Sequence, residues 1–241
     1  KWLAAEGIYE HSGDYEAGAY ESKSSPYHSF FQFHDDSDGA WPYNRTYDGW
    51  WGHDTLPKLN YENSEKLVEY ILNVARKWVS PPFSVDGWRL DVAADLGRTS
   101  EFNHRFWRDF RRVVKEANPD ALILAEHYGD PASWLEGDQW DSIMNYDAFM
   151  EPVTWFLTGM EKHSDSYNGG IWGDGEAFFN AMGYHMSRMQ TNTVMTAMNQ
   201  LSNHDHSRFL TRTNQMVGRI QTAGPEKAGQ NIKPCVFREA V

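Results

Sequence analysis

Five consecutive apolar residues, at positions 121–125 (Ala-Leu-Ile-Leu-Ala), are the segment that most constrains the fold of this chain. A run this short and this apolar is typical of a strand buried on both faces, as the strands of parallel sheets are. Parallel strands need crossover connections, which are usually helices. Helical patterns flank this run, so we predict a parallel α/β fold with right-handed crossovers.

Two amphipathic helices are predicted around a second buried strand. From Asn63, apolar residues recur at three- and four-residue steps until the pair Pro81-Pro82 stops the pattern. A second helix is predicted over 102–117, where Asn118-Pro119 ends it. Residues 83–92 lie between these helices and are mostly apolar, so we predict a strand there.

Weaker signals continue the alternation of strands and helices. They predict, in order, a strand at 142–146, helices over 148–160 and 174–189, a strand at 194–201, a helix starting near Gln215, a Gly/Pro loop at 223–230 and a terminal helix. Residues 1–60 lack helical periodicity and are predicted to be loop-rich. Only four strands are predicted from residue 83 onward, whereas a closed (β/α)₈ barrel needs eight, so the sheet is either small and open or part of a barrel.

Composition excludes several classes of protein. The 22 Lys and Arg against 34 Asp and Glu give a net charge of −12, which argues against nucleic-acid binding. No apolar run approaches the roughly 18 residues needed to span a membrane. The single cysteine, Cys235, excludes an internal disulfide and a cysteine-based zinc cluster. Aromatic residues reach 15% of the chain, which suits a neutral, hydroxyl-rich ligand, and a sugar is our first hypothesis.

Polar side chains follow the first two predicted strands where these strands end, and such carboxyl ends carry the active site in parallel α/β folds. Arg89 and Asp91 are two residues apart, so they share one face of a strand, and the arginine would keep the carboxylate ionised as a nucleophile requires. Glu126 directly follows the apolar run, where burial suits a general acid. The alternatives are a packing salt bridge and a solvated glutamate at a strand-to-loop transition.

The fourth predicted strand leads into Asn203-His204-Asp205-His206. Such side chains can hold sugar hydroxyls and stabilise positive charge, and the alternative is a polar turn that caps the next helix. We expect Asp205 to meet the carboxylates of the other two strand ends at one mouth of the sheet. Two carboxyl groups about 5–5.5 Å apart suit a retaining glycosidase.

A metal-dependent hydrolase that uses His204, His206 and Asp91 is an alternative from another class. No third ligand lies at a suitable spacing from the two histidines, so we predict no metal site here.

Three segments resemble, in the same order, the second, third and fourth conserved regions of the α-amylase family, glycoside hydrolase family 13. They are Gly87–Ala93 (Gly-Trp-Arg-Leu-Asp-Val-Ala), Ala125-Glu126 and Ser202–Asp205. Leu56–Asn60 (Leu-Pro-Lys-Leu-Asn) further resembles a motif of the neopullulanase, cyclomaltodextrinase and maltogenic amylase branch. The resemblance covers nearly the whole chain. It implies a partial (β/α)₈ TIM barrel, with about strands four to seven over residues 61–241, preceded by an inserted, loop-rich subdomain over residues 1–60.

The resemblance also implies roles for individual residues. Asp91 would be the nucleophile that forms a glycosyl-enzyme intermediate, with Arg89 orienting it. Glu126 would be the general acid and base, and Asp205 would stabilise the transition state with His204 as its neighbour. The remaining candidates for substrate binding are Asn203, His127, Tyr47, Trp50 and Trp51. Core packing of the small subdomain is the alternative for the last three.

The implied activity is hydrolysis of α-1,4-glucosidic bonds in starch-derived oligosaccharides, cyclodextrins or pullulan by double displacement. The alternatives are an α-glucan transferase of the same family and a non-catalytic carbohydrate-binding relative. The mechanism requires no cofactor. The resemblance leaves calcium (Ca²⁺) open, and the acidic stretch 35–39 fails the EF-hand spacing. Relatives in this branch also suggest a homodimer and a cytoplasmic location.

The family's first conserved region and its eighth strand have no counterpart in this sequence. We therefore expect a fragment of the catalytic domain. An open half-barrel exposes sheet edges, so the isolated segment is expected to have little activity.

Overall fold

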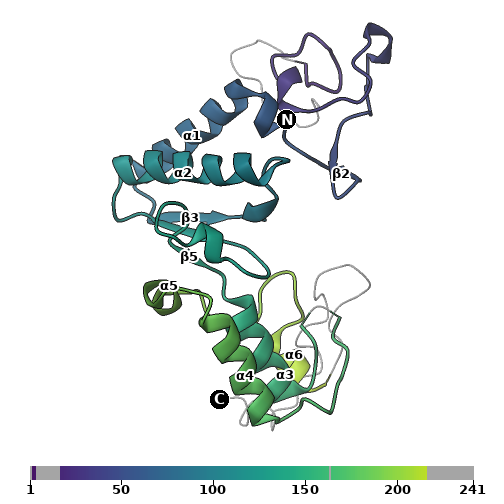
Figure 1. Cartoon of the computed structure of the whole chain (residues 1–241). Helices are drawn as coiled ribbons and strands as arrows, with labels where there is room; N and C mark the ends of the chain where they lie inside the picture. The colour runs from purple at the N-terminus through teal and green to yellow at the C-terminus, as the bar shows by residue number, and fades with distance from the viewer. Residues whose placement is uncertain (1, 4–16, 163, 216–241) are drawn as a thin grey trace. The chain divides into compact units, whose positions relative to one another are not determined.

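The computed structural model describes residues 2–3, 17–162 and 164–215, and Figure 1 shows its elements. These residues form two compact units. One consists of Lys1–Asp86 with Ala94–Ala121, and the other of Gly87–Ala93 with Leu122–Val241. Each unit is described by itself below. The predicted loop at 223–230, the terminal helix and Cys235 lie outside the described residues.

The second unit contains a three-stranded parallel sheet in the order β3 (Gly87–Leu90), β4 (Leu122–Ala125), β5 (Ser142–Ile143). Leu90 pairs with Ala125, and Ala125 pairs with Ile143, so the three strands end at the same level. Ile123 and Ala125 on one face of β4 are fully buried, but on the other face Leu122 is 41% exposed and Leu124 is partly buried, so the prediction of burial on both faces holds for one face only. The parallel α/β prediction is therefore confirmed, although the sheet formed by the described residues does not close into a barrel.

The predicted strand at 194–201 is wrong. Residues Thr191–Thr196 form helix α5 instead, in which the Thr196 hydroxyl donates to the carbonyl of Asn192. Only Met198 joins the sheet, through an isolated parallel bridge to Met144. The side chain of Met195 is 79% exposed, so the apolar residues of this segment do not form the buried face that a strand assignment assumed.

The strand predicted over 83–92 is shorter than expected. Phe83 and Ser84 donate their backbone N–H groups to the carbonyl of Ser80 in a turn, so pairing begins only at Gly87. At the other end the backbone of Val92 has a φ of 44°, which takes the chain out of the extended conformation. The turn and this backbone conformation therefore limit β3 to four residues.

Helices α1 (Glu65–Val79) and α2 (Ser100–Ala117) belong to the first unit and confirm the helical periodicity. The side chain of Ser64 accepts from the backbone of Leu67, and that of Thr99 accepts from Phe102, which caps both N-termini. The two helices pack side by side (Figure 1). The apolar face of α2 is buried, whereas α1 buries Leu67, Ala75 and Val79 and leaves Trp78 41% exposed. Each large side chain that is fully buried stabilises the fold by about 1.5–3 kcal/mol.

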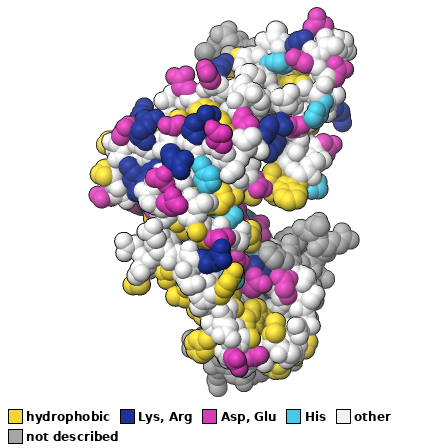
Figure 2. Space-filling view, in the orientation of Figure 1, with side chains coloured by type: hydrophobic (Ala, Val, Ile, Leu, Met, Phe, Trp, Pro, Cys, Tyr) yellow, Lys and Arg dark blue, Asp and Glu magenta, His cyan; other side chains and the backbone are white. Residues whose placement is uncertain are grey.

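Lys and Arg alternate with Asp and Glu on the outward face of these two helices (Figure 2). Arg112 pairs with Asp109 and with Glu116, and Arg76 also reaches Glu116. Mixed charge of this kind is a solvated helix surface.

Residues 17–60 are irregular, as their composition predicts. They contain two single-turn helices, η1 (His28–Phe30) and η2 (Asp38–Ala40), and a hairpin of β1 (Gly49–Trp50) and β2 (His53–Pro57). Their small core is an apolar cluster of Ala19, Phe30, Phe31, Phe33 and Leu67. Since Leu67 lies on α1, the loop region and this helix share one core. The boundary at residue 60 stays a prediction.

The elements described in the rest of the second unit are mainly helices. A π-helix at Tyr146–Met150 leads into α3 (Glu151–Thr158), and α4 (Gly175–Met186) follows, so both helices predicted for this region are confirmed. Helix α6 (Phe209–Thr213) ends before Gln215, and the helix expected to start near that residue would lie outside the described residues. No helix in the described part of the chain has the length and apolar character needed to cross a membrane.

Candidate active site

Four of the predicted site residues lie at adjoining strand ends of the second unit. Arg89 is on β3, and Asp91 is the first residue after this strand. Glu126 and His127 directly follow β4. The backbone N–H of Glu126 donates to the carbonyl of Leu90 at 2.9 Å, which continues the ladder by one residue. The parallel register therefore brings the two carboxylates to the same edge of the sheet.

A single guanidinium group contacts both carboxylates. Arg89 donates to Oδ1 of Asp91, and its Nη2 lies 3.2 Å from Oε2 of Glu126. Burial disfavours the charged form of Arg89, but its hydrogen bond with Asp91 and the charge of Glu126 outweigh this and raise its pKa. The two carboxylates differ in environment, since the side chain of Asp91 is 74% exposed and that of Glu126 is 8% exposed.

Protein donors contact both oxygens of the Glu126 carboxylate. The backbone N–H of Val92 donates to Oε2 at 3.1 Å, and the hydroxyl of Tyr146 donates to Oε1 at 3.1 Å. The left-handed backbone of Val92 is uncommon for a β-branched residue. The same turn, which follows Asp91, presents this N–H to Glu126.

Two stacked tyrosines lie beside Glu126. The rings of Tyr128 and Tyr146 are 4.3 Å apart at an angle of 4°. Burial raises the pKa of Tyr146, and hydrogen bonding with Tyr128 and the nearby charge of Glu126 add to the effect. Burial likewise raises the pKa of Tyr128, and the charges of Glu126 and Asp205 contribute to it. Both groups therefore remain neutral phenols at physiological pH.

The turn Asn203–His206 is linked to Glu126 through Tyr146. The side-chain amide of Asn203 donates to the Tyr146 hydroxyl at 2.9 Å, and its Oδ1 accepts from the backbone of Asp205 at 3.0 Å. Nδ1 of His206 lies 2.6 Å from the same Oδ1. His204 and Asp205 are more exposed, at 73% and 48% of their side chains, and Nε2 of His204 lies 3.5 Å from Oδ1 of Asp205.

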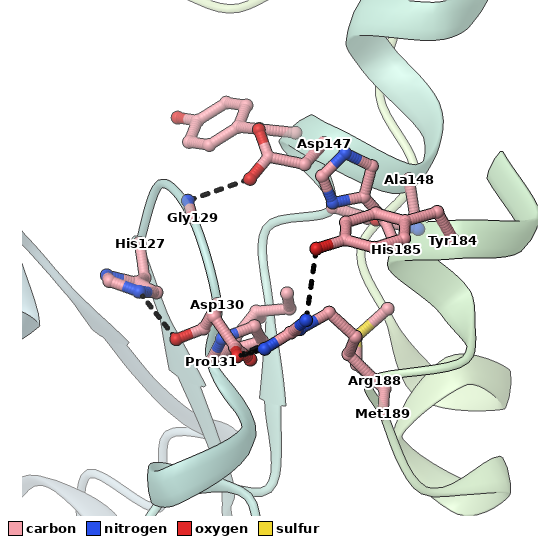
Figure 3. Close-up of a pocket in the computed structure, with 13 residues that line it drawn as sticks. His127, Gly129, Asp130, Pro131, Asp147, Ala148, Tyr184, His185, Arg188 and Met189 are labelled. Carbon is pink, nitrogen blue, oxygen red and sulfur yellow. Dashed lines mark hydrogen bonds and ion pairs between the residues drawn. The ribbon is translucent and has the colours of Figure 1, made fainter. Parts of the chain in front are cut away.

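His127 lines a separate cavity of about 180 Å³ within the same unit (Figure 3). Its Nε2 lies 3.3 Å from the carbonyl of Asp130. Arg188 pairs with the Asp130 carboxylate and donates to the hydroxyl of Tyr184 at 3.0 Å. Tyr146 also lines this cavity, so its ring is shared between the cavity and the surroundings of Glu126.

The three aromatic candidates of the loop region belong to the first unit. The indole N–H groups of Trp50 and Trp51 both donate to Oδ2 of Asp95, at 3.0 and 3.1 Å. The ring of Trp51 is therefore held at its N–H edge, while 79% of the residue remains exposed. Tyr47 packs against the apolar cluster, and its hydroxyl donates to the carbonyl of Asp54.

The described residues do not fit a metal ion. Among residues 2–3, 17–162 and 164–215, no group of three or more His, Cys, Asp or Glu side chains could hold one. In the acidic stretch, Asp38 pairs with Lys23, Asp36 with His28, and Asp35 accepts from a nearby backbone N–H. Protein donors thus contact these three carboxylates.

Sequence reasoning missed Tyr146, although its hydroxyl contacts Glu126. Tyr146 lies three residues beyond the end of β5, whereas Asp91 and Glu126 directly follow β3 and β4, so a search for polar residues directly after each strand passes over it. A hydroxyl there attracts less attention than a carboxylate, because a tyrosine in an aromatic-rich chain is more often a core residue.

At the strand ends, the guanidinium of Arg89 thus contacts one buried carboxylate, that of Glu126, and one exposed carboxylate, that of Asp91. The exposed carboxylate is open to a bound molecule, as a nucleophile must be. The buried carboxylate lies among fixed donors and can exchange a proton with a bound molecule.

Comparison with known proteins assigns the family. Residues 6–227 match the model of the α-amylase catalytic domain. The chain is 43% identical to neopullulanase 2 of Thermoactinomyces vulgaris over 156 residues, which are 65% of this chain and 23% of that protein. It is 37% identical to a Bacillus cyclomaltodextrinase over 192 residues, 80% of this chain and 31% of that protein. The chain thus spans about a quarter to a third of these relatives' length.

Solved structures agree with this assignment. A cyclic α-maltosyl-(1→6)-maltose hydrolase of Arthrobacter globiformis, in complex with that cyclic sugar, matches 82% of this chain and 40% of its own, with a TM-score of 0.64 and 29% identity. The debranching enzyme of Nostoc punctiforme, soaked with acarbose, matches 82% of this chain and 42% of its own, with a TM-score of 0.66 and 29% identity. The chain therefore belongs to the α-amylase family, as part of its catalytic domain, among homologues of neopullulanases, cyclomaltodextrinases and maltogenic amylases.

Proposed function

We propose that this chain carries the catalytic residues of a retaining glycosidase that cleaves α-1,4-glucosidic bonds in starch-derived oligosaccharides, cyclodextrins or pullulan. The observation that carries the proposal is the shared guanidinium of Arg89, which contacts the exposed carboxylate of Asp91 and the buried carboxylate of Glu126 at neighbouring strand ends. Double displacement needs two such carboxyl groups in different roles.

In the proposed reaction, a carboxylate oxygen of Asp91 attacks the anomeric carbon while Glu126 gives its proton to the leaving glycosidic oxygen. The bond to the leaving sugar breaks as the glycosyl ester forms. Glu126 then removes a proton from water, whose oxygen attacks the same carbon and releases Asp91 as a carboxylate. Asp205 stabilises the positive charge that develops on the sugar, with His204 and Asn203 holding hydroxyls.

The named relatives support the choice of substrate. They include a neopullulanase, cyclomaltodextrinases and a maltogenic amylase, and two matched structures were solved with a cyclic maltosyl sugar and with acarbose. We propose α-glucan oligosaccharides as ligands of this chain. His127 would contact the sugar on the acceptor side, and the exposed ring of Trp51, with Trp50 and Tyr47, would stack on glucose rings.

Within the family we assign β3, β4 and β5 to strands four, five and six of a (β/α)₈ barrel, and Met198 to the position of strand seven. Residues 1–60 would be the inserted loop domain. The mechanism relies on side-chain carboxylates and needs no cofactor. The homodimer implied by the resemblance stays a prediction.

Trapping the intermediate tests the roles of the two carboxylates. In the Glu126→Gln variant, α-maltosyl fluoride can still react with the nucleophile, because fluoride leaves without protonation, but the missing base slows hydrolysis of the ester. We expect peptide mass spectrometry to find a maltosyl group on Asp91. An ester on another carboxylate, or none, would overturn the assignment. Transfer of the maltosyl group to added glucose in preference to water would instead indicate the transferase.

A further inference from the structure

A backbone N–H group determines which atoms donate and which accept in the hydrogen bonds around Tyr146. The N–H of Asp205 can only donate, so the atom of Asn203 that it contacts is the amide oxygen. The other end of that amide is therefore an NH₂ group, and it donates to the hydroxyl oxygen of Tyr146. The tyrosine has one proton, and the carboxylate oxygen Oε1 of Glu126 is the strongest acceptor within its reach.

The two oxygens of Glu126 consequently differ. Oε2 faces a backbone N–H and the guanidinium of Arg89, two groups that oppose a proton on that atom. Oε1 faces only the Tyr146 hydroxyl among the described residues. A proton exchanged with a sugar would therefore reside on Oε1, the atom that Tyr146 contacts.

We propose that Tyr146 is a positioning residue that controls the protonation of Glu126, with Asn203 holding its hydroxyl toward Oε1. The proposal rests on the proposed function for the roles of acid and base. By donating to Oε1, the hydroxyl stabilises the carboxylate form of Glu126, which is the base of the second step. Oε1 is also the atom from which the proton passes to the leaving group in the first step.

Other charged or titratable groups near Glu126 stay in place when the tyrosine hydroxyl is removed. Arg89 contacts it from β3 and holds Asp91 on its other side, while Tyr128 stacks on the Tyr146 ring. The charge of Asp205 raises the pKa of Tyr128, and Nδ1 of His206 contacts Oδ1 of Asn203. A Tyr146→Phe substitution removes the donor to Oε1, and with it the acceptor of the Asn203 amide and the hydroxyl that bonds with Tyr128, while Arg89 keeps its contacts with both carboxylates.

The direct test is a titration of Glu126 that does not depend on turnover. In the full-length protein carrying ¹³C-carboxyl glutamate, the Glu126 signal is assigned through Glu126→Gln and followed against pH. We expect its midpoint to rise by about one pH unit in Tyr146→Phe, because the carboxylate loses a donor. Asn203→Ala, which leaves the hydroxyl free to turn, should raise it less. An unmoved or lowered midpoint would overturn the proposal.

A kinetic test separates this role from a merely structural one. In Tyr146→Phe the alkaline limb of kcat/KM for maltotriose should move to higher pH, while kcat/KM for α-maltosyl fluoride, whose leaving group needs no proton, stays within about twofold. An equal loss on both substrates would indicate packing damage and contradict the proposal. Tyr61→Phe is the control, because it removes a hydroxyl from a partly buried tyrosine of the first unit.

The two hypotheses fail separately. If the wild-type protein inverts the configuration at the anomeric carbon, or does not act on α-glucans, the proposed function fails. The titration still decides the role of Tyr146. If the wild-type protein retains configuration and the midpoint does not move, only the role of Tyr146 fails.

Discussion

Removing the charge of Arg89 should destabilise the protein through Glu126 and hardly at all through Asp91. The guanidinium contacts both carboxylates, but only Glu126 is buried, with 8% of its side chain exposed against 74% for Asp91. A double-mutant cycle that combines Arg89→Gln with Glu126→Gln measures one coupling energy. A second cycle with Asp91→Asn measures the other.

The expected magnitude follows from the geometry. At 3.2 Å, two unit charges attract by about 5 kcal/mol when the effective dielectric constant is near 20. About a third of the Arg89 side chain remains in water, and both groups lose hydration when they pair, so we expect a net coupling of about 2 kcal/mol. Water screens the exposed carboxylate of Asp91, and its coupling should stay below about 1 kcal/mol.

Urea unfolding at pH 7 gives the free energies for both cycles. Arg112 and Asp109 on α2 form a matched control, because their ion pair has an N–O distance of 3.0 Å and both side chains are largely exposed. Their coupling should be close to the experimental error. If the Arg89–Glu126 coupling is no larger than that of the control, or is smaller than the coupling to Asp91, the argument from burial is wrong.

Three further predictions concern single residues. Glu126→Gln should lower kcat for maltotriose about a thousandfold while the calorimetric affinity for acarbose stays within severalfold, and unchanged turnover would exclude the acid role. Burial raises the pKa of Tyr61 to about 12 from its ordinary 10, so the folded state holds this proton more tightly than the unfolded chain. The free energy of unfolding should therefore fall as pH rises from 10 to 12. In Tyr61→Phe this fall should be less steep by about 1 kcal/mol per pH unit, and equal slopes in urea unfolding would contradict this. Asp95→Ala removes the acceptor shared by Trp50 and Trp51, so chymotrypsin should cut the hairpin faster, whereas an unchanged cleavage rate would show that Asp95 does not hold it.

Local signals in the sequence were sufficient for the strand ends and the long helices. The run at 121–125 predicts a buried strand because only a parallel sheet covers both of its faces, and this placed Glu126 at the end of β4. The capped periodic segments predicted α1 and α2 because their apolar positions follow the helical repeat. The spacing of Arg89 and Asp91 also predicted that these two side chains would meet.

Features set by tertiary contacts could not be predicted in this way. Residues 194–201 contain apolar and β-branched side chains that suit a strand, but only Met198 finds a partner strand, and α5 forms before it. The acceptor role of Asp95 depends on two indoles more than 40 residues away along the chain. The contact of Tyr146 with Glu126 likewise joins two strand ends, and no spacing rule fixes it.

The stereochemistry of the first product tests the central claim most directly. With maltoheptaose and the full-length protein, proton NMR in the first minutes resolves the newly released anomeric proton before mutarotation. Double displacement by Asp91 and Glu126 predicts that the α-anomer appears first. Initial appearance of the β-anomer would contradict the mechanism and require other roles for both carboxylates.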